Sequence, residues 1–212
     1  MSQSRFDLAA ATWDEHPARM AMTRAVAQAI CSQVPVRPTM TALDFGCGTG
    51  LVTLALQPHV RRILGVDSSP AMLAKLQEKV QAMGVTNVDA LLLDFTVQPP
   101  PAELRVDLIV SAMALHHIAD IPALLQTFVQ MLAPGGALAL ADLDTEDGSF
   151  HPDPTGVYHT GIDRAWLMAQ FTALGLQDVR ATTAHEMERP TPDGAPRRYP
   201  IFLISGQLAG GA

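Results

Sequence analysis

Three closely spaced glycines after an apolar segment constrain the fold of this chain more than any other feature. Residues 43–50 read LDFGCGTG, so the strand predicted over Met40–Phe45 ends at these glycines, and a short helix, LVTLAL, follows before Pro58. Glycines at such a junction let the backbone approach a ligand, and the free amides at a helix start favour polar or anionic groups. Because a G-x-G-x-G sequence also forms plain tight turns, it is by itself weak evidence for a nucleotide-like ligand.

Short apolar segments alternate with helical patterns along the rest of the chain. Further strands are predicted over residues 62–66, 88–93, 107–110 and 137–141, and helices over 20–30, 70–83, 163–174 and from about Asp120 to before Pro134. Residues 178–188 and 198–206 are typical of an antiparallel pair, joined by a turn-rich loop over 190–196. This order predicts a doubly wound, Rossmann-like α/β sheet of seven strands, mostly parallel, with an antiparallel C-terminal strand at its edge.

Composition excludes several classes of protein. The 212 residues carry a net charge of −7 and only two lysines, so a nucleic-acid partner is not expected. No apolar stretch approaches the ~20 residues that span a bilayer, so no membrane segment is expected either. Two cysteines and an N-terminus without a secretion-signal pattern favour a cytoplasmic protein. We expect an N-terminal helical arm or lid over residues 1–38 and one α/β domain over 39–212.

Acidic residues close three successive predicted strands. Asp67 lies 67 − 44 = 23 positions beyond Asp44, where a carboxylate can accept hydrogen bonds from a ribose diol, and Asp94 follows the next strand beside Phe95. Either residue alone would be an ordinary loop cap, whereas three acids at one sheet edge favour a ligand. Leu51 breaks the dinucleotide fingerprint, and the Lys-Ser/Thr pair of a P-loop is absent. The acidic balance suits a cationic ligand.

Together these motifs resemble those of the class I S-adenosylmethionine-dependent methyltransferases. LDFGCGTG is similar to their first motif, and the segments that resemble the later motifs are GVDSSPAML (65–73), LLLDF (91–95), VDLIVSAMALHHIAD (106–120) and LAPGGALALAD (132–142). The resemblance covers residues 39–142 closely and is strongest to the small-molecule group around the ubiquinone/menaquinone-biosynthesis enzymes. It implies S-adenosyl-L-methionine as cofactor, S-adenosyl-L-homocysteine as product, and in-line methyl transfer to a small-molecule acceptor.

The resemblance also implies which residues bind the cofactor. They are Asp44, Gly46, Cys47, Gly48, Asp67, Ser68, Met72, Asp94, Phe95 and Ser111. In this assignment the glycines pass beneath the methionine part, Asp67 holds the ribose, Asp94 and Phe95 select adenine, and Ser111 lies beside the methionyl group. Cys47 is expected to be a small loop residue, since methyl transfer needs no thiol nucleophile. Trp13 is the candidate cover residue of the arm, with a surface arm as the alternative.

Histidines and a tyrosine are the candidate groups on the acceptor side. His116 follows the fourth strand, and His151, Tyr158 and His159 lie in a long segment after the fifth, within the expected acceptor-side insertion over 143–161. A histidine there could act as a general base or could simply fix the loop. No metal is expected, although Asp142, Asp144, His151, Asp153 and His159 could form a cluster.

Three questions stay open at this point. The chain could be a monomer or a homodimer, because nothing in the sequence decides between them. The alternatives to a methyltransferase are a non-catalytic adenosylmethionine-binding domain and an NAD(P)-type oxidoreductase, the latter disfavoured by Leu51. The identity of the methyl acceptor is also open.

Overall fold

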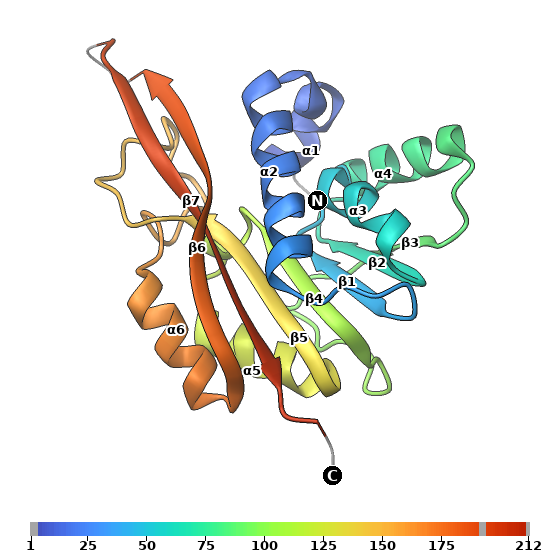
Figure 1. Cartoon of the computed structure of the whole chain (residues 1–212). Helices are drawn as coiled ribbons and strands as arrows, with labels where there is room; N and C mark the ends of the chain where they lie inside the picture. Colours follow the sequence, from blue (N-terminus) through green and yellow to red (C-terminus); the bar gives the residue numbers. More distant parts are fainter. Residues whose placement is uncertain (1–3, 191–193, 211–212) are drawn as a thin grey trace.

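Seven strands form one sheet in the order β3-β2-β1-β4-β5-β7-β6 (Figure 1) in the computed structural model, which describes residues 4–190 and 194–210. The strands are β1 (Thr41–Phe45), β2 (Arg62–Asp67), β3 (Val88–Leu92), β4 (Val106–Ala112), β5 (Leu132–Leu143), β6 (Leu176–Pro190) and β7 (Pro196–Leu208). Strands β1 to β5 pair in parallel, and β7 is antiparallel to both of its neighbours. The predicted Rossmann-like, mostly parallel sheet is confirmed.

Helices cover both faces of this sheet. They are α1 (Arg5–Ala9), α2 (Pro17–Gln33), α3 (Leu51–Leu56), α4 (Pro70–Met83), α5 (Ile121–Met131) and α6 (Arg164–Ala173). Helices α2 and α3 share one hydrophobic cluster on one face, whereas α5 and α6 share a second cluster on the other. The result is the three-layer α/β arrangement in which ligands bind at the carboxyl ends of the strands.

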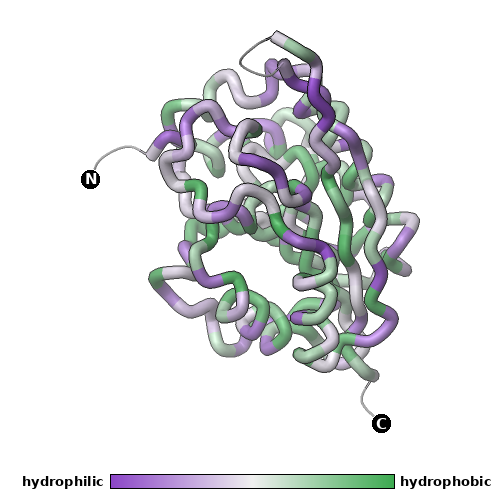
Figure 2. The backbone as a smooth tube through the Cα atoms, turned by 90° about the vertical axis from the view of Figure 1, so that its left-hand side faces the viewer, coloured by the Kyte–Doolittle hydropathy of each residue, from purple (hydrophilic) through white to green (hydrophobic). Residues whose placement is uncertain are grey.

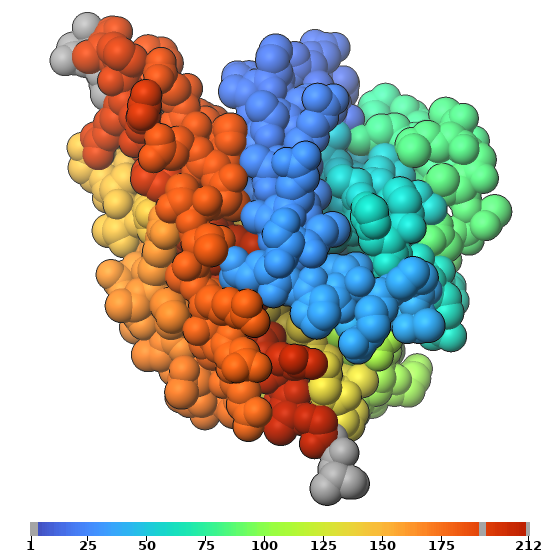
Figure 3. All heavy atoms as spheres, in the orientation of Figure 1, coloured from blue at the N-terminus to red at the C-terminus, as the bar shows by residue number. Residues whose placement is uncertain are grey.

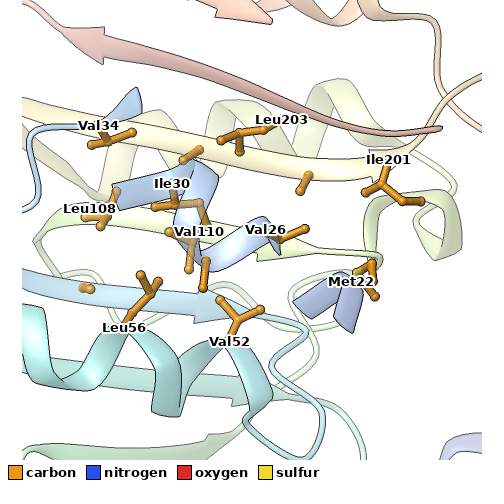
Figure 4. Packing of buried hydrophobic residues seen from close by; sticks show 14 of the residues in the cluster. Met22, Val26, Ile30, Val34, Val52, Leu56, Leu108, Val110, Ile201 and Leu203 are labelled. Atoms are coloured by element: carbon orange, nitrogen blue, oxygen red, sulfur yellow. The ribbon is translucent and has the colours of Figure 1, made fainter. Parts of the chain in front are cut away.

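The core explains why the central strands are apolar on both sides. In β4, Val110 packs in the cluster under α2, and its neighbour Ile109 packs in the cluster under α5. Helix α2 inserts Val26 and Ile30, both fully buried, between α3 and strands β4 and β7 (Figure 4). Burial of each such side chain stabilises the fold by roughly 1.5–3 kcal/mol. The tube view accordingly shows hydrophobic residues gathered along the inner strands (Figure 2).

Capping residues begin α4, α5 and α6 where the sequence predicts. Ser69 accepts a hydrogen bond from the Met72 amide at the start of α4, and Gly84 ends that helix with φ of 65°. Asp120 and Asp163 cap α5 and α6 in the same way as Ser69. The local chemistry of these caps is strong enough to define the boundaries without tertiary information.

The C-terminal pair differs from its prediction in one respect. The antiparallel strand β7 does not lie at the edge, because it inserts between β5 and β6. Residues Ile201 to Ile204 of β7 are fully buried, whereas β6 presents polar side chains such as Thr182 and Glu186. The more apolar strand therefore takes the inner position. Of the predicted turn-rich loop, residues 191–193 lie outside the described residues.

The N-terminal segment is more ordered than the sequence suggests. Helix α2 begins at Pro17, before the predicted Met20, and a 3-10 turn over residues 10–15 links it to α1. Neither α1 nor this turn shows an amphipathic period, so both escaped prediction. In the part of the chain that the structure describes, no helix is long and apolar enough to cross a bilayer.

Candidate active site

A cavity of about 820 Å³ opens at the carboxyl ends of the strands. The glycine-rich loop after β1 and the loops after β2, β3 and β4 form its floor, and α1, the start of α2, residues 150–158 and the outer end of β6 form its walls. In the space-filling view a notch separates the N-terminal helices from the outer end of the β6–β7 hairpin (Figure 3). The predicted binding edge of the sheet is therefore hollowed, and chain segments far apart in sequence enclose it.

The glycine-rich loop has a backbone that only glycine can supply. Gly46 has φ of 65°, and a Cβ at this position would lie 2.5 Å from the Cβ of Ala114 in the loop after β4. Gly50 has φ of 81° and its Cβ would lie 2.3 Å from Leu76 in α4. Both positions therefore require glycine for conformation and for close approach. The loop lies flat against its neighbours and leaves Gly48 facing the cavity.

Asp67 is held in one orientation by the backbone. Its Oδ2 accepts a hydrogen bond from the Gly48 amide at 2.8 Å, and its Oδ1 accepts one from the Ser69 amide at 2.8 Å. Each carboxylate oxygen has a second lone-pair site, so both can still accept from a ligand diol. Burial raises the pKa of Asp67, and the backbone amides oppose that shift.

Asp44 carries an unusual protonation equilibrium. The side chain is buried beneath the glycine-rich loop, where Oδ2 accepts a hydrogen bond from the Thr53 hydroxyl at 2.6 Å. Burial raises the pKa of Asp44 to about 7, with the nearby charge of Asp67 adding to the rise. A cation in the cavity would stabilise the ionised form.

The remaining predicted cofactor residues fall into two groups. Ser68, Met72, Asp94 and Phe95 line the cavity with the glycine-rich loop, whereas Ser111 does not. The Ser111 hydroxyl is buried and donates to the Phe45 carbonyl at 2.9 Å, so it binds β1 instead of facing the cavity. Cys47 is buried at the loop, and burial raises the pKa of its thiol well above the ordinary value. A protonated thiol of this kind is a poor nucleophile.

The N-terminal arm closes over the loop through its acidic residues. Asp7 accepts a hydrogen bond from the Ser69 hydroxyl at 2.5 Å, at the start of α4. Asp14 accepts from the Thr49 hydroxyl at 2.5 Å and pairs with Lys79 at 2.7 Å. These contacts place Trp13 and Phe6 on the cavity wall. The arm and the cofactor-side loop are thus one connected structure.

Three histidines meet on the opposite side of the cavity. His116 is buried and hydrogen-bonds through Nδ1 to the fully buried Asp142 at 2.6 Å, so its Nε2 points away from that carboxylate. His117 bonds through Nδ1 to the Gly156 carbonyl at 2.7 Å, and His151 packs against both rings. Within the described residues the Nε2 atoms of His116 and His151 have no hydrogen-bond partner.

The other acceptor-side predictions are placed less centrally. Tyr158 lines the cavity although it is 62% exposed. His159 is not among the lining residues, and its Nε2 atom bonds to the Ile118 carbonyl at 2.9 Å. The alternative acidic cluster does not form, because Asp144 pairs with Arg164 and Asp142 with His116. The ring nitrogens of His116, His117 and His151 do lie within 4.8 Å of one another, a spacing that could hold a metal ion.

Several lining residues had no sequence motif to mark them. Arg5, Arg19 and Arg189 reach the cavity from α1, α2 and β6, and they look like ordinary surface arginines in the sequence. Met113 lines it with φ of 58°, a conformation that is uncommon outside glycine and that often marks a functional site. Met113 directly follows β4, inside the segment 106–120 that resembles a methyltransferase motif, but that resemblance gave it no role.

Comparisons with known proteins agree with this geometry. A family model described as a methyltransferase domain matches residues 42–136. An uncharacterized methyltransferase of Schizosaccharomyces pombe is 34% identical over 135 residues, which are 58% of this chain and 48% of that protein. A trans-aconitate 2-methyltransferase of Methylobacterium nodulans is 31% identical over 125 residues, 58% of this chain and 45% of that protein. The chain thus spans about half the length of these curated relatives.

A solved structure extends the similarity of fold to nearly the whole chain. The structure of DhpI in complex with SAH superimposes with a TM-score of 0.73 and 20% identity, over 98% of this chain and 94% of that one. At this identity the likeness concerns the fold alone. Together the comparisons identify residues 42–136 as a methyltransferase domain, within a chain that shares its fold with a solved structure over nearly its whole length.

Proposed function

We propose that this chain transfers a methyl group from S-adenosyl-L-methionine to a small-molecule acceptor. The observation that carries the proposal is a single cavity with a glycine-rich loop and an oriented Asp67 on one side, and histidines with unpartnered nitrogens on the other. Its volume of about 820 Å³ lies in the range of small-molecule sites, roughly 300–1,000 Å³. The trans-aconitate enzyme among its relatives is consistent with a small acceptor.

The residues present fit the cofactor. Asp67 would accept from both ribose hydroxyls, because the amides of Gly48 and Ser69 hold its two oxygens outward. Asp44 would attract the ammonium group, and Phe95 would pack on the adenine ring beside Asp94. When bound, the cofactor supplies a methyl group that its sulfonium sulfur has already activated.

The protein's own task is then to orient the acceptor and exclude water. Orientation of two reactants in one site contributes on the order of 7–11 kcal/mol to lowering a barrier. Trp13 and Phe6 on the arm would shield the reacting groups, which is the lid role expected for the N-terminal segment. His116, whose Nδ1 is fixed by Asp142, would present Nε2 as a proton acceptor when the acceptor group carries a proton.

Titration calorimetry with S-adenosyl-L-homocysteine tests the cofactor half of this proposal. We expect saturable binding by the wild type, and affinity at least about 100-fold lower for Asp67→Ala, since hydrogen bonds to a charged group contribute roughly 1.5–3 kcal/mol each. Asp89→Ala is the matched control, because it removes an aspartate of β3 that forms an ion pair with Arg62 of β2. This variant should bind S-adenosyl-L-homocysteine normally.

Two results would contradict the proposal. Saturable binding of NADH without binding of S-adenosyl-L-homocysteine would favour the oxidoreductase alternative. Tight cofactor binding with no methyl transfer across a broad panel of metabolites would favour a non-catalytic binding domain.

A further inference from the structure

Three arginines line the cavity and have no carboxylate partner among residues 4–190 and 194–210. Arg5, Arg19 and Arg189 come from three different elements. Within the described residues, Arg5 donates to the Thr155 carbonyl and to His117, with a longer contact to the Asp153 carbonyl. Arg19 donates to the Trp13 carbonyl, and Arg189 donates to the Phe150 carbonyl. In the described part of the chain, none of the three forms an ion pair with an acidic side chain.

Partial burial distinguishes these three arginines, because Arg24, Arg37, Arg61, Arg105 and Arg180 also form no ion pair within the described residues but are exposed outside the cavity. Outside it, the basic residues that do form ion pairs within the described residues are Arg62, Lys75, Lys79, Arg164, Arg197 and Arg198. The chain has 21 acidic residues against 14 basic ones, so a shortage of carboxylates is not the cause. Partly buried charges are costly unless they are paired. Unpaired cations in a cavity of an acidic protein therefore indicate an anionic ligand.

The three cations divide between two places in the cavity. Arg19 stacks on the Trp13 ring at 3.8 Å, and the Trp13 indole nitrogen lies 4.0 Å from the position that a Cβ on Gly48 would occupy. Arg19 therefore lies on the glycine-loop side and suits the single carboxylate of the cofactor. Arg5 and Arg189 both lie near His151, whose pKa is lowered chiefly by burial and further by the charges of His116, His117 and these arginines. The pKa of Arg19 is lowered by burial and further by the charge of Arg189. Arg5 and Arg189 flank the histidine side.

We propose that the methyl acceptor is an organic oxyanion, a carboxylate or phosphonate, whose charge is held between Arg5 and Arg189. This inference rests on the proposed methyltransferase function and names the class of its acceptor. Arg189 is well placed for the role because it stacks on Phe150 at 4.0 Å and donates one Nη1 bond to the Phe150 carbonyl, which fixes the guanidinium while other donors stay available. Arg5 is anchored similarly by the Thr155 carbonyl at 2.6 Å.

The same geometry favours an anion over a metal ion among the three histidines. The Arg5 guanidinium lies 3.2 Å from the Nε2 atom of His117 and donates to it, because His117 Nδ1 already donates to Gly156. A divalent cation would have to displace this arginine and would lie near two positive charges. An oxyanion would be attracted by both guanidinium groups, with His116 and His151 free to bond to the rest of the acceptor.

The test uses the full chain saturated with S-adenosyl-L-homocysteine, at constant ionic strength. The carboxylate probes are trans-aconitate and benzoate, and the phosphonate probe is phenylphosphonate. Benzamide is the neutral counterpart of benzoate. We expect an acid to bind saturably and benzamide not to bind. The carboxylate and phosphonate arms show which oxyanion fits better. The acceptor assay repeats this comparison with labelled S-adenosylmethionine and matched acid and amide pairs.

Variants separate the acceptor site from the cofactor site. Arg5→Gln and Arg189→Gln should each raise the dissociation constant of the acid at least about tenfold and leave the affinity for S-adenosyl-L-homocysteine unchanged, which also shows that the variants fold. Arg189→Lys should retain part of the acid binding. Arg198→Gln, which removes an exposed partner of Glu186, is the control and should match the wild type.

Each other outcome counts against the inference. It is overturned if no acid binds, if benzamide binds as well as benzoate, if the two glutamine variants keep full acid affinity, or if amides are methylated as fast as acids. It is also overturned if a chelator abolishes acid binding, because a metal would then hold the anion. Failure of S-adenosyl-L-homocysteine to bind would instead refute the proposed function itself.

Discussion

At the scale of single residues, Asp44 should make cofactor binding depend on pH near neutrality. Its pKa of about 7 in the free protein means that much of the population carries a neutral carboxyl group below this pH. A cationic ligand favours the ionised form, so binding must be coupled to loss of a proton. The sequence placed Asp44 at the sheet edge, but burial of the side chain depends on the loop and on α3 packing over it.

We therefore expect the affinity for S-adenosyl-L-methionine to rise with pH from 5.5 to about 7 and then to level off. A single group can change the affinity up to tenfold per pH unit below its pKa. Calorimetry at several pH values up to 7.5 stays below the pKa of the ligand's own amino group, about 7.7–8.0. Asp44→Asn should flatten this dependence, and Glu78→Gln on the exposed face of α4 should not. An unchanged pH profile in Asp44→Asn would assign the proton to another group.

At the scale of elements, the N-terminal arm is attached to the cofactor loop by a few polar contacts. Asp7 bonds to the cap of α4, and Asp14 bonds to Thr49 and Lys79. Such hydrogen bonds to charged groups contribute roughly 1.5–3 kcal/mol each, and less where solvent reaches them. Because the arm buries little of its own surface, its opening should cost less than global unfolding.

The double variant Asp7→Ala/Asp14→Ala should release the arm without unfolding the sheet. We expect faster amide exchange and faster proteolysis over residues 4–16, together with cofactor affinity reduced roughly tenfold, while the thermal midpoint of the sheet changes little. Glu15→Ala is the matched control, since Glu15 is exposed and no hydrogen bond or ion pair is described for it. If exchange in the arm is the same in both variants, these contacts do not hold it closed.

At the scale of the whole molecule, partly buried histidines at the cavity should contribute to the dependence of stability on pH. The pKa values of His117 and His151 are lowered to about 4, chiefly by burial. Between their unfolded value of about 6.5 and pH 4, the unfolded chain binds more protons than the native one, so these groups make stability fall as the pH falls. The raised pKa of Asp44 acts in the opposite direction over the same window.

We expect the free energy of unfolding to decrease from pH 6.5 to pH 4.5, with a net slope below about 1.4 kcal/mol per pH unit, since Asp44 and the raised pKa of Asp67 oppose the two histidines. Urea unfolding at several pH values measures this slope. His151→Gln should make the slope shallower, and Asp44→Asn should make it steeper. A slope that does not change in either variant would place the titrating groups elsewhere in the molecule.

Sequence patterns determined the parts of this protein that depend on neighbouring residues. Apolar runs and caps such as Ser69 and Asp120 define strands and helices, and the glycines and acids at strand ends define the cofactor side, because parallel strands bring their carboxyl ends to one edge. The order of β6 and β7 could also have been read from their polarity, since β7 is the more apolar strand.

Only the tertiary structure decided the acceptor side. Arg5 and Arg189 lie at opposite ends of the chain, and His116 and His151 follow different strands, yet all four line one cavity, where Asp142 of β5 fixes the His116 ring. Their proximity results from α1 docking on α4 and from the β6–β7 hairpin extending past the sheet. No local period or spacing records such long-range packing, and the pKa of Asp44 and the missing partners of the arginines depend on it. The sequence therefore determined the glycine-rich loop and the acids at the sheet edge, and the packing of distant segments determined which groups face them across the cavity.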